Sequence, residues 1–129
     1  MLHIQSLTVD AADPRGLATF WEAALGWRRT FEDDEEVVIE ATAADATSHA
    51  VCGMLFLRVD DDRVVKNRLH LDLRPEDQAA EVARLEALGA TRLDLGQGDV
   101  TWIVLADPEG NEFCVLRALR PDEVATGGS

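Results

Sequence analysis

Two stretches of the chain repeat the same order of hydrophobic and polar positions. Residues 2–9 alternate between apolar and polar side chains, and an Asp-Pro pair then opens an amphipathic stretch that ends at Gly26. Residues 67–73 alternate in the same way, and a Pro-Glu pair precedes a second amphipathic stretch that ends at Gly89. Alternation is typical of a strand, and recurrence every three or four residues is typical of a helix. The chain therefore contains a structural repeat of about half its length.

The first amphipathic stretch predicts a helix that begins after Asp13 and ends at Gly26. The Asp13 carboxylate can accept an N–H of the first helical turn, and Pro14 fits the first helical position because no N–H is needed there. A glycine at the end suits a left-handed cap. The apolar face of this helix consists of Leu17, Phe20, Trp21, Ala24 and Leu25.

The second amphipathic stretch predicts a helix with a narrower apolar face. Pro75 indicates its start, and Gly89 indicates its end. The residues of the apolar face recur at helical spacing, and they are Ala79, Val82, Leu85 and Leu88.

Three strand-like runs follow each predicted helix. They cover residues 27–31, 35–40 and 53–59 in the first half, and residues 91–95, 100–106 and 111–118 in the second. This order predicts an α+β fold of two βαβββ modules, over residues 1–60 and 61–119, followed by a flexible tail at 120–129. Each sheet has one face that its helix covers, so the two modules can curl their open faces together around a shared cavity.

The composition limits the classes of partner. The 129 residues include 25 acidic and 12 basic side chains, for a net charge of −13. Such a charge repels nucleic acids and anionic membrane surfaces. The apolar runs are far shorter than the roughly 20 residues of a membrane span, and the first residues do not resemble a signal peptide. Cys52 and Cys114 form no CxxC pair, which favours reduced thiols, and we expect a cytoplasmic protein.

Several segments, in their order along the chain, resemble those of a known superfamily. They are Asp13-Pro14, Phe20-Trp21, Leu25-Gly26-Trp27, Lys66-Asn67-Arg68-Leu69-His70-Leu71-Asp72-Leu73 and Asp107-Pro108-Glu109-Gly110-Asn111-Glu112-Phe113-Cys114. Together they resemble the vicinal oxygen chelate superfamily, and most closely its glyoxalase-like domain branch of the actinobacterial type. The resemblance implies a curled, mixed eight-stranded sheet around a cavity, with the helices on the outer face. Members of the superfamily catalyse several reactions or sequester drugs, so the fold alone selects no function.

The resemblance also implies where a metal site would be. Metal-dependent relatives bind one divalent ion through the first and last strands of each module, usually with His and Glu. His70 matches one of these positions, whereas Ser6 and Cys114 stand at two others. Leu55 or Leu57 stands at the fourth, and leucine has no donor atom. Since zinc, iron and nickel sites need about three protein ligands, we expect no metal and no other cofactor.

Alternation places His70 and Asp72 on the side of their strand opposite to the leucines at 69 and 71. If the leucines pack under the second helix, His70 faces the cavity, where it could act as a general base. The alternative is a hydrogen-bonded structural histidine. Asp72 could orient the imidazole or hold a cation, but it could equally form an ion pair with Arg74 or Arg68.

Five further residues complete the predicted ligand-binding cavity. Cys114 lies in an apolar run, where a thiol is typically buried and inert, although a neighbouring His70 could activate it as a thiolate. Ser6 lacks the sequence context of a hydrolase nucleophile. Leu57 and Trp102 could form apolar walls, and Glu112 could place a charge at the rim; ordinary packing or solvent exposure is the alternative for these side chains.

These residues favour a protein that binds a small organic molecule in the cavity without a complete metal site. The main alternative is a lyase or isomerase that uses His70 as a base or as a remnant metal ligand. A third possibility is an interaction module whose cavity is filled by its own side chains. Two modules in one chain enclose the cavity without a partner, so we expect a monomer or a homodimer.

Overall fold

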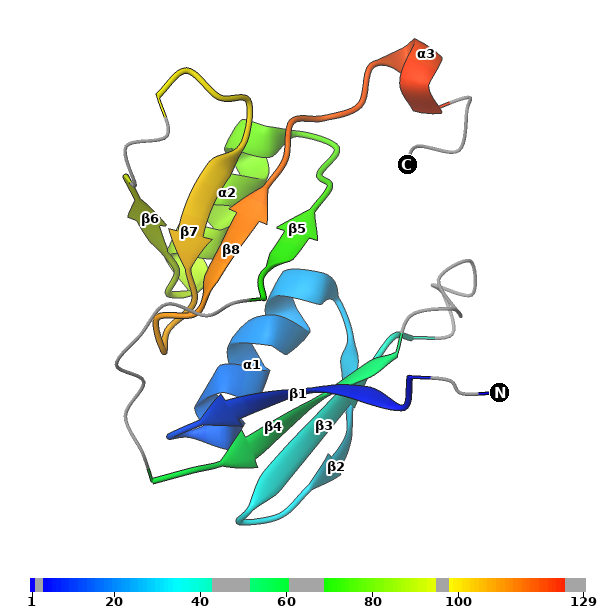
Figure 1. Cartoon of the computed structure of the whole chain (residues 1–129), viewed down its shortest axis with the longest axis vertical. Helices are drawn as coiled ribbons and strands as arrows, with labels where there is room; N and C mark the ends of the chain where they lie inside the picture. Colours follow the sequence, from blue (N-terminus) through cyan, green and yellow to red (C-terminus); the bar gives the residue numbers. More distant parts are fainter. Residues whose placement is uncertain (2–3, 43–51, 61–68, 95–97, 125–129) are drawn as a thin grey trace. The chain divides into compact units, whose positions relative to one another are not determined.

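The computed structural model describes residues 1, 4–42, 52–60, 69–94 and 98–124. The chain divides into two compact units, Met1–Val64 and Val65–Ser129. Each unit contains one four-stranded sheet and one longer helix (Figure 1).

The first unit consists of strands β1 (Ser6–Ala11), β2 (Arg28–Glu32), β3 (Glu36–Glu40) and β4 (Gly53–Arg58) and of helix α1 (Pro14–Leu25). The strands lie in the order β1-β4-β3-β2, with β1 parallel to β4 and the other pairs antiparallel. Both predicted ends of α1 are confirmed. The Asp13 carboxylate accepts the N–H of Gly16 at 3.2 Å, and Gly26 forms a left-handed cap with φ 70°.

Helix α1 packs on one face of the first sheet. It buries Leu17, Ala18, Phe20 and Trp21. Alternate residues of the two central strands are buried with them, namely Val37, Ile39, Met54 and Phe56. The remaining side chains of these strands, such as Leu55 and Leu57, point to the opposite face and are half-buried. The unit therefore has one tightly packed face and one open, largely apolar face.

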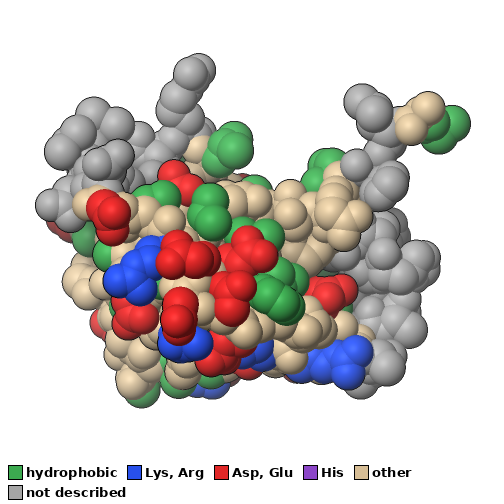
Figure 2. Space-filling view, turned by 90° about the horizontal axis from the view of Figure 1, so that it is seen from below, with side chains coloured by type: hydrophobic (Ala, Val, Ile, Leu, Met, Phe, Trp, Pro, Cys, Tyr) green, Lys and Arg blue, Asp and Glu red, His purple; other side chains and the backbone are tan. Residues whose placement is uncertain are grey.

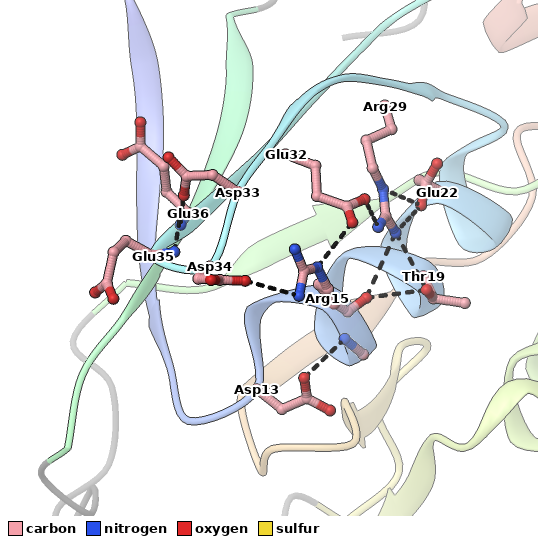
Figure 3. A network of polar contacts seen from close by, with 11 residues as sticks. Asp13, Arg15, Thr19, Glu22, Arg29, Glu32, Asp33, Asp34, Glu35 and Glu36 are labelled. Atoms are coloured by element: carbon pink, nitrogen blue, oxygen red, sulfur yellow. Dashed lines mark hydrogen bonds and ion pairs between the residues drawn. The ribbon is translucent and has the colours of Figure 1, made fainter.

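A network of ion pairs joins α1 to β2 (Figure 3). Arg29 binds Glu22 of the helix, and its Nη1 lies 2.6 Å from Glu32 Oε1. Arg15 Nε lies 2.7 Å from the other oxygen of Glu32 and also pairs with Asp34. The hydrogen bond from Arg29, followed by that from Arg15, lowers the pKa of Glu32.

Acidic side chains also gather on the face seen in Figure 2, beside a smaller number of Lys and Arg side chains. This appearance agrees with the net charge of −13. Part of the excess lies in the acidic run at 32–36, where the Asp33 carboxylate accepts the N–H groups of Glu35 and Glu36 and so closes the turn before β3. The run therefore serves as a strand connection.

The second unit repeats the same connectivity. Its elements are β5 (Leu71–Leu73), α2 (Gln78–Leu88), β6 (Thr91–Leu93), β7 (Ile103–Ala106) and β8 (Glu112–Val115). The strand order is β5-β8-β7-β6, with β5 parallel to β8 and the other pairs antiparallel. The α+β class and the two βαβββ modules are confirmed. The described strands form two four-stranded mixed sheets, one in each unit.

The predicted start of the second helix is wrong. Helix α2 begins at Gln78, and its N-cap is Asp77, whose carboxylate accepts the N–H of Ala80 at 3.1 Å. Pro75 lies outside the helix, because a proline is as compatible with the extended segment before a cap as with the first helical turn. Gly89 ends the helix as predicted. Only Val82 and Leu85 are buried on α2, whereas Ala79 and Leu88 are exposed.

A short helix, α3 (Pro121–Val124), forms within the predicted tail. The guanidinium group of Arg117 donates to both carboxylate oxygens of Glu123 at 2.8 and 2.7 Å. These hydrogen bonds, together with one from the backbone of Arg120, lower the pKa of Glu123 to about 2. Within the described ranges, no helix has both the length and the hydropathy that crossing a membrane requires.

Candidate functional site

The register of the second sheet places two reactive side chains beside each other. Asp72 of β5 is paired with Cys114 of β8, and Cys114 is paired with Val104 of β7. Paired residues project to the same face of a sheet, and their neighbours in sequence project to the other. Phe113 and Val115, the fully buried positions of β8, mark the face on which α2 lies (Figure 1). Asp72 and Cys114 therefore belong to the open face.

His70 joins these two residues from the segment directly before β5. Its Nε2 lies 3.2 Å from Oδ1 of Asp72, so an N–H there can donate to the carboxylate. One donor atom from each of His70, Asp72 and Cys114 lies within 4.8 Å of the other two. The side chains of His70 and Asp72 are 51% and 54% exposed, and Cys114 is half-buried. We call these three residues the His70 cluster.

The other residues predicted for the site lie elsewhere in the two units. Glu112 lies two positions before Cys114 on β8, which places it on the same face, and Trp102 is an exposed residue directly before β7. Ser6 and Leu57 lie on β1 and β4 of the first unit. The structure thus brings three of the seven predicted side chains together within one unit.

The described residues place Asp72 in contact with His70, whereas Arg74, one of its two predicted arginine partners, contacts a backbone carbonyl. Arg74 donates from Nη1 to the backbone carbonyl of Arg117 at 2.8 Å, while Asp72 contacts His70. Arg68 lies outside the described residues. In the described part of the chain Asp72 contacts His70, and its role in orienting the imidazole stays a prediction.

Two polar residues that were not among the predicted site residues hold the strands of the site in place. Asp107 is buried, and its carboxylate accepts the backbone N–H groups of Glu109 and Asn111 and the side-chain amide of Asn111. It thereby closes the turn that aligns β7 with β8. Gln78 at the start of α2 donates to the carbonyl groups of Thr101 and Val115. A Pro and a Gly this close together are typical of a turn, but only the folded chain shows that the aspartate of the segment is buried.

The His70 cluster offers an imidazole, a carboxylate and a thiol. Three protein ligands are the number found in catalytic zinc sites, so this donor set fits a divalent metal ion. The sequence-based expectation of no metal counted His70 as the single remaining ligand. Asp72 does not match a ligand position of the superfamily, and the expectation does not count the thiol of Cys114 as a ligand. The absence of a metal stays a prediction.

Comparisons with known proteins agree on the fold. No curated protein matches the sequence. Among solved structures, a glyoxalase/bleomycin resistance protein/dioxygenase family enzyme from Burkholderia phytofirmans is similar at a TM-score of 0.69, with 15% identity over 92% of this chain and 100% of that chain. A fosfomycin resistance protein from Mesorhizobium loti is similar at a TM-score of 0.64, with 12% identity over 97% of this chain and 98% of that chain.

A third similar structure is the bleomycin-binding protein of Streptomyces verticillus in complex with copper(II)-bleomycin. It has a TM-score of 0.58 and 16% identity over 92% of this chain and 98% of that chain. These likenesses show the fold of the glyoxalase/bleomycin resistance proteins. Together with the family match that follows, they confirm the resemblance to the vicinal oxygen chelate superfamily. The family described as a glyoxalase-like domain matches residues 6–116, so the repeat, the strand order and the sequence agree, and the chain belongs to the glyoxalase-like domain family.

Proposed function

We propose that the protein binds a small organic molecule on the open face of the second sheet, with His70 as its polar anchor. The observation that carries this proposal is the meeting of His70, Asp72 and Cys114 on the face turned away from α2. Structural relatives include a bleomycin-binding protein and a fosfomycin resistance protein, which supports a small molecule as the ligand.

The surroundings of the cluster suit an organic ligand. Val104 is the partner of Cys114 on β7, and Leu93 is the partner of Val104 on β6, so both lie on the same face as the cluster. Apolar side chains beside a few polar groups are the usual lining of a small-molecule site. His70 and Asp72 then provide a donor and an acceptor that can orient the ligand.

The experiment is a ligand screen with amide chemical shifts as the readout. Bleomycin, fosfomycin and a library of small organic acids and amides are added to isotope-labelled protein. Binding at the proposed place shifts the amide signals of His70, Asp72 and Cys114. In the variant His70→Ala, affinity for a confirmed probe is expected to fall by about 1–3 kcal/mol, the range for an unsatisfied polar partner.

The matched control is Glu86→Ala, which removes an exposed polar side chain from α2. This variant should bind the same probe as the unaltered protein does. Both variants should keep their melting temperature, because His70 and Glu86 are both well exposed. The proposal fails if the shifts map to another surface, or if His70→Ala unfolds many degrees earlier and still binds normally.

The contact between His70 and Asp72 also favours a second candidate, a lyase or isomerase with His70 as its base. An imidazole that donates from Nε2 to a carboxylate keeps Nδ1 as its basic nitrogen. Such an enzyme would exchange a carbon-bound proton of its ligand with deuterated water. The exchange rate should disappear in His70→Ala and fall in Asp72→Asn. A bound probe that never exchanges would exclude this candidate and leave simple binding.

A further inference from the structure

We infer that Cys114 is a nucleophilic thiol, which adds covalently to the conjugated double bond of an α,β-unsaturated carbonyl compound with His70 as its proton carrier. This inference deepens the proposed function and rests on it, because it names a chemical class for the molecule that binds at the His70 cluster. All the groups that it needs lie within the second unit.

The sulfur of Cys114 has an imidazole beside it. Its Sγ lies within 4.8 Å of a ring nitrogen of His70 and of a carboxylate oxygen of Asp72. A thiol close to an imidazole is the usual arrangement of a nucleophilic cysteine, since the ring can take the proton from the sulfur. Such contacts are often long before a ligand binds. Because the side chain of His70 is half-exposed, it can rotate toward the sulfur without disturbing buried neighbours.

The Asp72 carboxylate keeps the proton at the site. The imidazole that donates from Nε2 to Asp72 has its other ring nitrogen available as the base. The carboxylate also repels a negative charge on the nearby sulfur, which favours a thiolate that forms only together with the protonated imidazole. Asp72 and Cys114 are register partners on paired strands, so the backbone fixes their separation before a ligand arrives.

The reaction is an addition, in which every atom of both partners is kept. The Sγ–H proton of Cys114 passes to the basic ring nitrogen of His70, and the thiolate forms an S–C bond to the β-carbon of the double bond. The π electron pair moves toward the carbonyl group to give an enolate, and the protonated imidazole returns the proton to the α-carbon. The product is a thioether on Cys114. The addition needs no oxidant or reductant, and no leaving group departs.

The cluster favours this class of electrophile over acyl compounds. Addition to a conjugated double bond needs a nucleophile and a proton carrier, which Cys114 and His70 provide. Acyl transfer requires, in addition, hydrogen-bond donors aimed at an oxyanion. Val104 and Leu93 lie on the same face of the sheet and offer apolar contact to the carbon chain of the ligand.

The test measures the rate at which methyl vinyl ketone, a small α,β-unsaturated ketone, alkylates the reduced full-length protein. The variant Cys52→Ser carries Cys114 as its only cysteine, and mass spectrometry of the intact chain follows the adduct. Cys114 should react at least about tenfold faster in the folded chain than in the same variant unfolded in urea, because the folded state supplies the base. A folded rate equal to or below the unfolded rate overturns the inference, since it is the behaviour of a buried, inert thiol.

The role of His70 is tested in the same background. His70→Ala and the more conservative His70→Gln should each slow the reaction of Cys114 by about 100-fold. Added imidazole should restore part of the rate in His70→Ala, which a purely structural histidine would not allow. Melting temperatures show which variants are folded at the assay temperature. An unchanged rate in either folded variant overturns the inference.

The second cysteine provides a matched control. Cys52 is also half-buried, and it lies in the first unit, directly before β4. The variant Cys114→Ser keeps Cys52 as its only thiol, and its rate should be the same with and without His70→Ala. If Cys52 slows as much as Cys114 does, the effect of His70 is not specific to its cluster and the inference is wrong.

The class of electrophile has its own readout. With the acyl donor p-nitrophenyl acetate, the ratio of the folded to the unfolded rate of Cys114 should be at least about tenfold smaller than with methyl vinyl ketone, because acyl transfer lacks its oxyanion donors. An equal or larger ratio for the acyl donor would contradict the assigned class.

The failure of this inference can be told apart from the failure of the proposed function. If an organic probe binds reversibly at the His70 cluster while the folded chain does not accelerate alkylation of Cys114, the covalent step is wrong and the proposed function stands. If alkylation of Cys114 is fast and depends on His70, but its rate never saturates and no organic probe shifts the amide signals of the cluster, the nucleophile stands and the proposed function fails.

Discussion

The two units share one connectivity but use their side chains differently. The first unit has strands of five or six residues, and its helix buries five side chains. The second has strands of three or four residues, and its helix buries two. Burial of apolar area is the main source of stability in a fold. The first unit therefore has the larger apolar core, and the second has the smaller one.

On the open faces of the two sheets, it is the second unit that carries the more reactive side chains. In the second unit, the pairing of the first and last strands places Asp72 beside Cys114. The corresponding pairing in the first unit places Thr8 beside Leu55 and Asp10 beside Leu57. Neither pair combines two metal-binding or nucleophilic groups. The two copies of the module thus share one pattern of strand pairing. The first copy has the larger apolar core, and the second carries the reactive side chains on its open face.

Removing one large aromatic side chain from each core should test the difference in packing. Phe56→Ala in the first unit is expected to lower the free energy of unfolding by about 3–5 kcal/mol, as usual for a buried Phe. Phe113→Ala should lower it by about 1 kcal/mol less, because the cavity beneath a sparsely buried helix can collapse more completely. Urea denaturation measures both. If Phe113→Ala lowers the free energy of unfolding as much as Phe56→Ala or more, the core of the second unit is not the weaker one.

The two helix ends should respond differently to an added methyl group. Gly26 has φ 70°, and a side chain there meets open space. Gly89 has φ 118°, farther from the left-handed conformation that other residues can adopt, and a side chain would contact Pro108. We expect Gly26→Ala to lower stability by about 1 kcal/mol and Gly89→Ala by about 2 kcal/mol. Thermal unfolding distinguishes these values, and the reverse order would contradict the backbone argument.

The second helix should depend strongly on its capping aspartate. Asp77→Ala removes the acceptor for the N–H of Ala80 and is expected to lower stability by about 1 kcal/mol. Asp77→Asn should restore most of this loss, since asparagine caps about as well as aspartate. Glu76→Ala, which alters an exposed acidic neighbour, is the control. If Glu76→Ala has the same effect as Asp77→Ala, charge rather than capping explains the loss.

The smallest expected effect is on acid sensitivity. The lowered pKa of Glu32, caused first by Arg29, means that its ion pairs stabilise the fold above the pKa of the unfolded chain. This stabilisation is lost as pH falls through the lower folded value. Glu32→Gln should therefore lose less stability on acidification than the unaltered protein does. The difference should be small, since exposed ion pairs contribute little.

The same reasoning applies to Glu123, but its effect should stay local. Its pKa of about 2 means that the contact with Arg117 persists until the pH approaches that value. Acidification from about pH 4.5 to about pH 2 should release α3 while the sheets remain folded. The amide signals of Asp122 and Glu123 report the release, and Glu123→Gln should show the released state at neutral pH. Simultaneous loss of the sheet signals would contradict a local effect.

Most of the fold could be predicted because local signals and the repeat agree. The cap at Asp13, the end at Gly26 and the alternating strand segments each specify one conformation, and the second module supplies an independent copy. The start of α2 could not be predicted in the same way. Pro75 and Asp77 are both good residues near a helix start, and the choice between them depends on how the preceding segment leaves β5.

The candidate site could be predicted only in part. Alternation along one strand was sufficient to place His70 and Asp72 on a common face. The resemblance to the superfamily placed Cys114 near His70. Alternation could not show that Cys114 stands opposite Asp72, because the register between β5 and β8 joins segments about forty residues apart and is set by packing of the whole unit. The buried role of Asp107 has the same origin. The least predictable feature of the site is therefore a relation between strands rather than a residue type.

The pairing of the first and last strands of each unit also has a consequence for synthesis. A chain emerges from the ribosome N-terminus first. The first sheet has all its strands once Arg58 has emerged, and it can form while the second unit is still incomplete. In the described part of the chain, β5 pairs with β8 alone, so it must wait for the last strand of its sheet. Until Cys114 has been added, a nascent chain carries His70 and Asp72 on an unpaired segment, and an interrupted product has no assembled centre.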